Sequence, residues 1–130
     1  MTAAASHPYA TRLALRRLLK PALLAVVVAA FSAYARRYYI EPESIAFACE
    51  AMPWQGWCAA RSLLIQTFAQ GGLGWAALAA AVLALATGAV LPAYAAWLIG
   101  TAGLIFYCYE FAAVGALAGA LVLVRKLSQR

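Results

Sequence analysis

Residues 72–124 contain a single formally charged side chain, Glu110. A soluble domain of this size has too little interior to bury more than fifty consecutive residues of this kind. A lipid bilayer accepts them, because about 20 apolar residues cross its roughly 30 Å hydrocarbon layer. The 130-residue chain, with 67% hydrophobic and 11% charged residues, is therefore predicted to be an all-α integral membrane helical bundle that forms a single membrane domain.

The basic residues stand at the ends of the apolar runs. The chain has a formal net charge of +6, from 10 Lys and Arg residues against 4 Asp and Glu residues. In a soluble protein this charge suggests nucleic acid as a partner. Here the flanking positions indicate orientation in a bilayer, because cationic flanks stay in the cytoplasm. We expect a multi-pass protein of the inner (plasma) membrane with both termini cytoplasmic, the lipid bilayer as a partner and no nucleic acid.

Residues 1–21 are predicted to be a basic cytoplasmic segment that begins with a loose polar tail at 1–8. Its cations are Arg12, Arg16, Arg17 and Lys20. Three of them recur every four residues and so share one helical face. We interpret the segment as a charged flank that orients the next helix; the alternative is a short interfacial helix on anionic lipid. Pro21 is expected to open a new helix, with Lys20 outside helical geometry.

Residues 22–39 are predicted to form the first transmembrane helix. A rival interpretation is a secretory signal peptide, because the small residues around position 34 resemble a cleavage site. Two arginines, Arg36 and Arg37, would directly follow that cut, and a large, bulky segment precedes the apolar run. We therefore expect residues 22–39 to remain in the mature chain as a membrane span.

Residues 40–71 are predicted to be an external loop, periplasmic or extracellular, with an interfacial helix. Over residues 36–61 three glutamates balance three arginines, whereas the terminal segments are purely basic. Helical spacing over residues 59–70 predicts a helix that lies on the outer surface or extends the next span. Three residues before it break regular structure: Pro42, Pro53 and Gly56.

Cys49 and Cys58 lie nine residues apart within this external loop. In an oxidising compartment they are expected to form a structural disulfide that adds roughly 2–3 kcal/mol by chain entropy. The alternative is a catalytic thiol pair in a membrane thiol oxidoreductase. Such redox pairs usually show a Cys-x-x-Cys spacing, which these two residues lack.

The remaining spans are predicted at residues 72–88, 92–107 and 111–125, which gives about four transmembrane helices. A single helix over residues 92–125 would reduce the count to three, but it would measure about 50 Å, too long for one ordinary crossing. It would also bury Glu110, at a cost of at least ~2.5 kcal/mol. A tight turn just before Glu110 is therefore preferred, although no Gly or Pro marks it.

Glu110 and a glycine pair are the remaining candidate functional features. Glu110 is interpreted as an interfacial carboxylate at a helix N-terminus; the alternative is proton or cation transfer within a small oligomeric transporter or channel. Gly115 and Gly119 form a GxxxG pattern that lets helix backbones approach closely. Their packing is expected within the chain, or else against another membrane subunit.

No cofactor or metal is expected, because the three cysteines and His7 form no ligand cluster. His7 precedes every span, which argues against a buried haem. No catalytic triad or phosphate-binding loop is present in the sequence, which favours a non-enzymatic role. We therefore expect an accessory, anchor or scaffold subunit that associates with other membrane protein subunits or with itself; the transporter and the thiol oxidoreductase are the alternatives.

Overall fold

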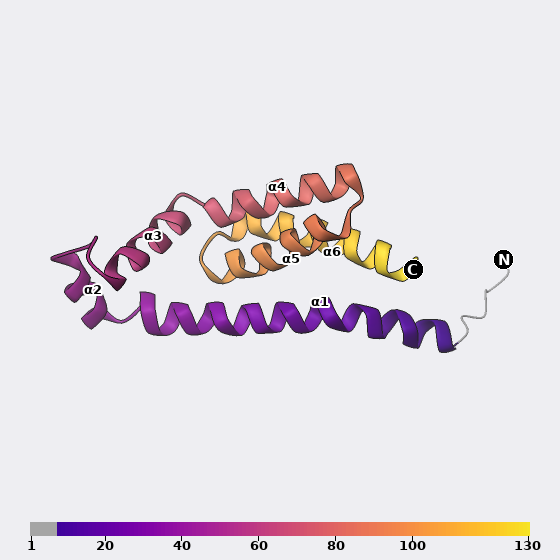
Figure 1. Cartoon of the computed structure of the whole chain (residues 1–130), viewed down its shortest axis with the longest axis horizontal. Helices are drawn as coiled ribbons and strands as arrows, with labels where there is room; N and C mark the ends of the chain where they lie inside the picture. Colours follow the sequence, from indigo (N-terminus) through magenta and orange to yellow (C-terminus); the bar gives the residue numbers. More distant parts are fainter. Residues whose placement is uncertain (1–7) are drawn as a thin grey trace.

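The computed structural model describes residues 8–130, which form helices and short turns only (Figure 1). The predicted tail at 1–8, apart from Pro8, and His7 lie outside this range. The helices are α1 (Pro8–Ala35), the π-helix η1 (Arg36–Ile40), α2 (Glu43–Glu50), α3 (Trp57–Ala69), α4 (Gly72–Thr87), α5 (Val90–Ile105) and α6 (Tyr109–Ser128).

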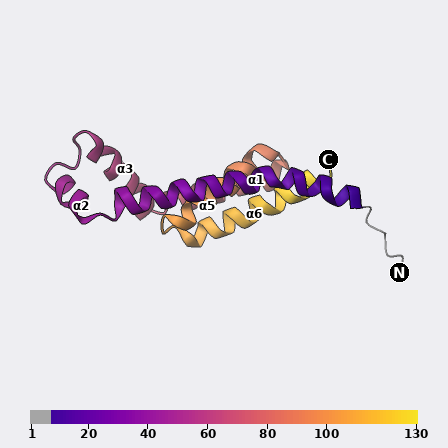
Figure 2. The ribbon, with the colours of Figure 1, turned by 90° about the horizontal axis from the view of Figure 1, so that it is seen from below.

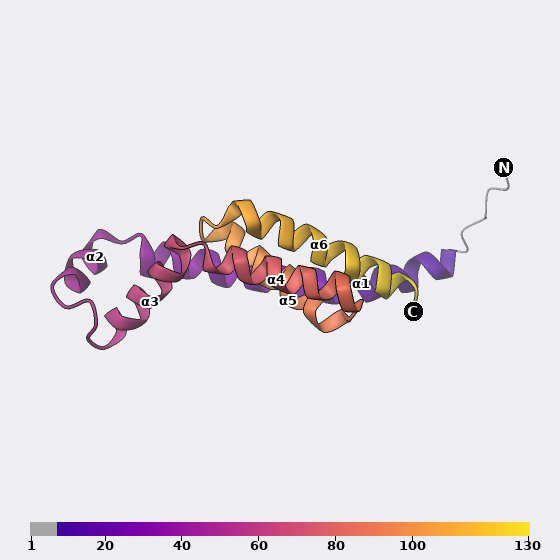
Figure 3. The same cartoon turned by 90° about the horizontal axis from the view of Figure 1, so that it is seen from above.

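The elongated molecule has two distinct ends. Helices α4, α5 and α6 pack into a close three-helix unit, and the long helix α1 lies alongside α5 and α6 (Figure 1). Figures 2 and 3 show the same arrangement of helices from below and from above. In all three views the start of α1 lies at the same end as the C-terminus, while α2 and α3 form the opposite end.

The three-helix unit is held at close range by glycine and alanine. A Cβ added at Gly115 would lie 2.7 Å from the backbone of Ala77 in α4, and one added at Gly119 would lie 2.9 Å from the carbonyl oxygen of Ala93 in α5. At Gly100 the added Cβ would lie 2.7 Å from a methyl group of α6. No side chain fits at these positions, so the helix backbones themselves are in contact.

Large apolar side chains point away from this unit. Leu85 is 64% exposed and Leu121 69% exposed, while Ala77, Ala84, Ala93 and Ala96 are fully buried. A water-soluble bundle would bury its leucines and leave small or polar residues outside. The reversed arrangement is expected when lipid surrounds the helices, because lipid tails solvate leucine as well as a protein core does.

Within residues 8–130, two helical segments are long and apolar enough to cross a membrane, residues 11–40 and α6. Helices α3 and α4 are bent by 61° at a short break, and they provide a third crossing if the bent pair counts as one span. Helix α5 is apolar but has only 16 residues, about 24 Å at 1.5 Å per residue.

Helix α1 runs without interruption through Pro21, which corrects the expected start of a new helix there. Lys20 is helical, so the predicted boundary between residues 1–21 and 22–39 is not a break in the chain's structure. The ring of Pro21 is buried, and the indole N–H of Trp97 in α5 donates a hydrogen bond of 3.1 Å to the Pro21 carbonyl. These contacts offset the helical hydrogen bond that proline removes.

The predicted turn before Glu110 is present. Helix α5 ends at Ile105 and α6 begins at Tyr109, so residues 92–125 are two antiparallel helices rather than one. Tyr107 takes φ = 63°, the only positive value at a non-glycine residue among residues 8–130. A tyrosine therefore occupies the left-handed conformation that glycine usually supplies.

Residues 40–71, which were predicted to be a loop with one helix, contain more helix than the sequence predicted. Besides α3, which covers most of the helix expected at 59–70, they include α2, and the π-helix η1 ends at Ile40, where this segment begins. The breakers Pro42 and Pro53 bound α2 rather than prevent it: Pro42 is its N-cap. The interval between two prolines is long enough for two helical turns.

Replacing Gly115 with valine tests the close packing. The new side chain meets the Ala77 backbone, so we expect Gly115→Val to lower the free energy of unfolding in detergent by about 1–3 kcal/mol. Leu117→Val is the matched control, because Leu117 is 66% exposed on the same helix and its trimming should change little. The readout is the melting temperature followed by circular dichroism; equal melting temperatures for both variants would contradict the packing.

Candidate functional site

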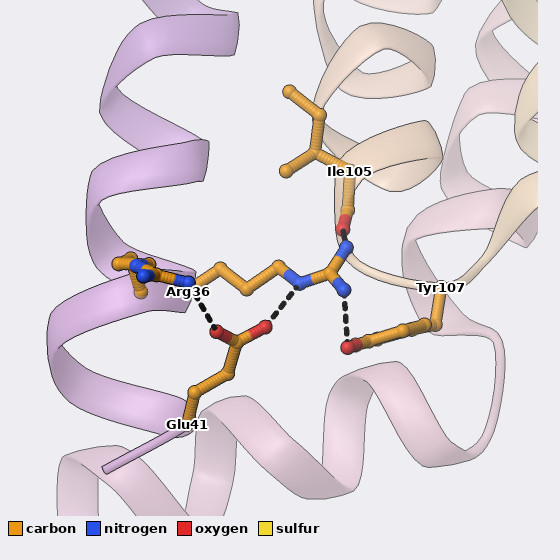
Figure 4. A network of polar contacts seen from close by, with 5 residues as sticks. Arg36, Glu41, Ile105 and Tyr107 are labelled. Atoms are coloured by element: carbon orange, nitrogen blue, oxygen red, sulfur yellow. Dashed lines mark hydrogen bonds and ion pairs between the residues drawn. The ribbon is translucent and has the colours of Figure 1, made fainter.

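The Arg36 side chain makes three polar contacts at the α2–α3 end (Figure 4). Its Nε donates to the Glu41 carboxylate at 2.9 Å, and its Nη1 donates to the Ile105 carbonyl oxygen at 2.9 Å. Its Nη2 donates to the Tyr107 hydroxyl. One guanidinium thus connects the end of the first helix with the turn between α5 and α6.

The position of Arg36 suits the electrostatics of the α5 C-terminus. The last carbonyl groups of a helix lack intrahelical donors and carry partial negative charge. Ile105 is the last residue of α5, and a cation from another helix binds its carbonyl oxygen. The guanidinium carbon also lies 3.9 Å from the centroid of the Tyr107 ring, where the π-face attracts a cation.

Two arginines contact the Glu41 carboxylate. It pairs with Arg36 at 2.9 Å and with Arg37 at 3.9 Å. The Arg36 and Glu41 side chains are 32% and 38% exposed, so solvent screens the pair and its net contribution is about 1 kcal/mol or less. These ion pairs therefore orient the side chains more than they add to the free energy of unfolding.

Arg61 repeats this pattern from α3. Its Nε donates to the Tyr39 carbonyl oxygen at 3.1 Å and its Nη2 to the Ile40 carbonyl oxygen at 3.2 Å. These are the last two residues of η1. Arg61 therefore binds the open carbonyl end of the first helical segment, just as Arg36 binds that of α5.

Cys49 and Cys58 form a disulfide, with their Cα atoms 5.3 Å apart. It ties the end of α2 to the first turn of α3, and the two residues are only 3% and 8% exposed. Cys108, the remaining cysteine, is buried and its thiol donates to the Phe68 carbonyl oxygen at 3.4 Å. It marks the contact between the α5–α6 turn and α3.

Glu110 is exposed in the first turn of α6. There a carboxylate faces the partial positive charge of the helix N-terminus. Together with Trp75, Tyr107 and other residues it lines an open depression of about 350 Å³ between α3, α4 and the α5–α6 turn. Within the described residues it makes no salt bridge.

The other predicted residues lie elsewhere. Gly115 and Gly119 are turned into the three-helix unit. The basic residues of α1 lie on the exposed surface near the opposite end of the molecule (Figure 1): Arg12, Arg16, Arg17 and Lys20. The structure therefore does not bring the candidates into one site. Among residues 8–130 it also has no group of three His, Cys, Asp or Glu side chains placed to hold a metal ion.

Comparison of the chain with protein-family models, characterised proteins and solved structures gives no match. The function has to follow from the chain's own chemistry. The polar contacts at the α2–α3 end are made within the chain, between side chains and carbonyl groups of helix ends. The contacts of Arg36 with Glu41, Ile105 and Tyr107, called the Arg36 clasp below, position helices. Among the residues that make them, no nucleophile is in contact with a base.

Replacing Arg36 tests the clasp. We expect Arg36→Gln to free the α5–α6 turn, because glutamine is too short to reach Ile105 and carries no charge. Loss of these partly exposed bonds costs about 1 kcal/mol, which corresponds to roughly five-fold faster amide hydrogen exchange at residues 106–108. Arg37→Gln is the control, since Arg37 is 79% exposed and makes only the longer contact. Equal exchange rates in both variants would show that the Arg36 contacts do not restrain the α5–α6 turn.

Proposed function

We propose that this chain is a small four-span protein of the inner (plasma) membrane that acts as an accessory, anchor or scaffold subunit. Its partner would be a larger membrane complex or further copies of itself. The observation that carries the proposal is the outward-facing apolar surface of α1. This helix uses one narrow stripe for contacts within the chain and leaves the rest of its apolar surface without a partner in the monomer.

The stripe consists of Pro21, Ala25 and Ser32, which are buried at spacings of four and seven residues. That repeat matches one seam of a helix that packs at a shallow angle against its neighbours. Outside the seam, side chains such as Val27 and Phe31 are 64% and 73% exposed. Lipid solvates such residues, and helices of other subunits also pack against them.

The distribution of charge supports an orientation with both chain ends in the cytoplasm. All four acidic residues lie at or near the α2–α3 end, in α2, in the segment before it and at the start of α6. The opposite end carries only cations, from the start of α1 and the end of α6. The positive-inside rule places such an end in the cytoplasm, and the Cys49–Cys58 disulfide suits an oxidising external compartment.

The four-span arrangement combines these points. Helices α4 and α5 have 16 residues each, about 24 Å, slightly less than the usual crossing. They lie beside α1 and α6, which meet the length requirement. Two short helices that pack against longer neighbours still cross the membrane, because their flanking residues reach the interface or the bilayer thins locally.

The alternatives receive less support. A transporter or channel that uses Glu110 needs this carboxylate on a path through the bundle, whereas Glu110 is exposed at a helix start. A thiol oxidoreductase that uses Cys49 and Cys58 needs an accessible sulfur, whereas both residues are nearly fully buried. The scaffold role requires neither.

Purification in mild detergent tests the scaffold role. A tagged chain should elute with a stoichiometric membrane partner or as an oligomer, with the mass measured by native mass spectrometry. We expect Phe31→Ala combined with Val27→Ala to reduce the partner-bound fraction several-fold, because the two side chains lie on the unpartnered face. Leu85→Ala, on the outward face of α4, is the control. Recovery of the chain as a lone monomer in every mild detergent would contradict the scaffold role.

A further inference from the structure

A groove of about 580 Å³ opens between α1, α5 and the end of α6, far from the Arg36 clasp. Its charged lining consists of Arg16, Arg17 and Lys20 from α1 and Arg130 beyond α6. They come from segments more than 100 residues apart in sequence, so the fold rather than a local run of cations builds this cluster.

Among residues 8–130, no acidic side chain forms a salt bridge with the cations of the groove. The four acidic residues of the whole chain are Glu41, Glu43, Glu50 and Glu110. They belong to the segments at the other end of the molecule, around α2 and the start of α6 (Figure 1). Four cations close together repel one another unless an anion lies between them. No acidic side chain supplies that anion at this end of the molecule, so the groove suits an anionic ligand.

The lining of the groove is also partly apolar, which indicates the kind of anion that fits it. Leu13, Val90, Tyr94 and Leu127 line it together with the cations. A second, apolar pocket of about 200 Å³ lies between the same three helices, next to Pro21, Trp97 and Leu123. On α5 and α6 the two linings follow one another along one helix face: Tyr94 is followed by Trp97, and Leu127 is preceded by Leu123 and Val124.

We propose that this groove binds one anionic phospholipid of the cytoplasmic leaflet. The guanidinium and ammonium groups of Arg16, Arg17, Lys20 and Arg130 hold the phosphodiester, since arginine and lysine both bind phosphate oxygens strongly. An acyl chain follows the apolar pocket beside Trp97. Basic pockets between helices on the cytoplasmic side of a membrane are the usual place for such headgroups.

The amphiphilic character decides between the two sources of phosphate. Free phosphate has no apolar part, so it would leave the pocket beside Trp97 unused. A phospholipid uses both the cationic and the apolar part. The inference rests on the proposed membrane placement, but not on the scaffold role: a chain that works alone in the bilayer would still bind the lipid.

Native mass spectrometry with defined lipids tests the proposal. Phosphatidylglycerol and phosphatidylcholine of equal chain length are titrated into the detergent-solubilised chain. We expect Arg16→Gln combined with Lys20→Gln to weaken phosphatidylglycerol binding about twenty-fold, from roughly five-fold for each charge. The matched control is Arg125→Gln combined with Lys126→Gln, which removes two charges from the same end but outside the groove lining. It should change the affinity less than three-fold.

Equal weakening by both pairs would overturn the proposal, because binding would then follow net charge alone. So would displacement of phosphatidylglycerol by an equal concentration of inorganic phosphate, which would indicate a free-anion site. Circular dichroism of each variant checks that it folds. Arg16, Lys20 and Arg125 are exposed, and Lys126 is half-buried.

A second measurement locates the acyl chain. Phosphatidylglycerol with brominated acyl chains should quench the fluorescence of Trp97, obtained as the difference between the parent chain and Trp97→Phe. The other tryptophans, Trp54, Trp57 and Trp75, belong to the α2–α3 end and the start of α4. Quenching of Trp97 should saturate at one lipid per chain and be lost in the Arg16→Gln, Lys20→Gln variant. Equal quenching by brominated phosphatidylcholine would refute the specific site.

Discussion

The structure depends on the contact of helix backbones in the α4–α6 unit. Glycines at positions such as Gly100 and Gly115 leave no room for a side chain, so much of the interior is filled by backbone and by alanine methyl groups, together with Val122 and Leu123 of α6. Most of the other large apolar side chains consequently point outward. Such an arrangement has little hydrophobic driving force in water, but it is favourable in lipid, where association rests on van der Waals contact between closely fitting surfaces.

The polar contacts concentrate where this close packing ends. Helix α1 touches the three-helix unit only along one seam, so it needs further attachment at its end. Arg36 supplies it through the Ile105 carbonyl group, and Arg61 binds the carbonyl groups that end η1. Both arginines neutralise helix ends that would otherwise expose unsatisfied acceptors. The opposite end carries the cations of the groove that is proposed to bind an anionic lipid.

The sequence predicted the helical, apolar character, and the cost of burying Glu110 predicted the turn between α5 and α6. It did not predict that Tyr107 would take the left-handed conformation, because no local pattern marks it. It was wrong about Pro21, since the contact with Trp97 lies 76 residues away. Two of the partners of Arg36 lie 69 and 71 residues away, so nothing in its sequence neighbourhood distinguished this residue from Arg37. Tertiary contacts of this kind leave no trace in a local pattern.

Spin labels in lipid nanodiscs test the account most directly. Nitroxides placed at Leu85 and Leu121, on the outward faces of α4 and α6, should collide readily with dissolved oxygen and hardly at all with a water-soluble nickel chelate. A label at Gln55, exposed in the α2–α3 end, provides the reference for water. If Leu85 and Leu121 gave the same high nickel collision rate as Gln55, the large apolar side chains would face water, and the membrane account of this fold would be contradicted.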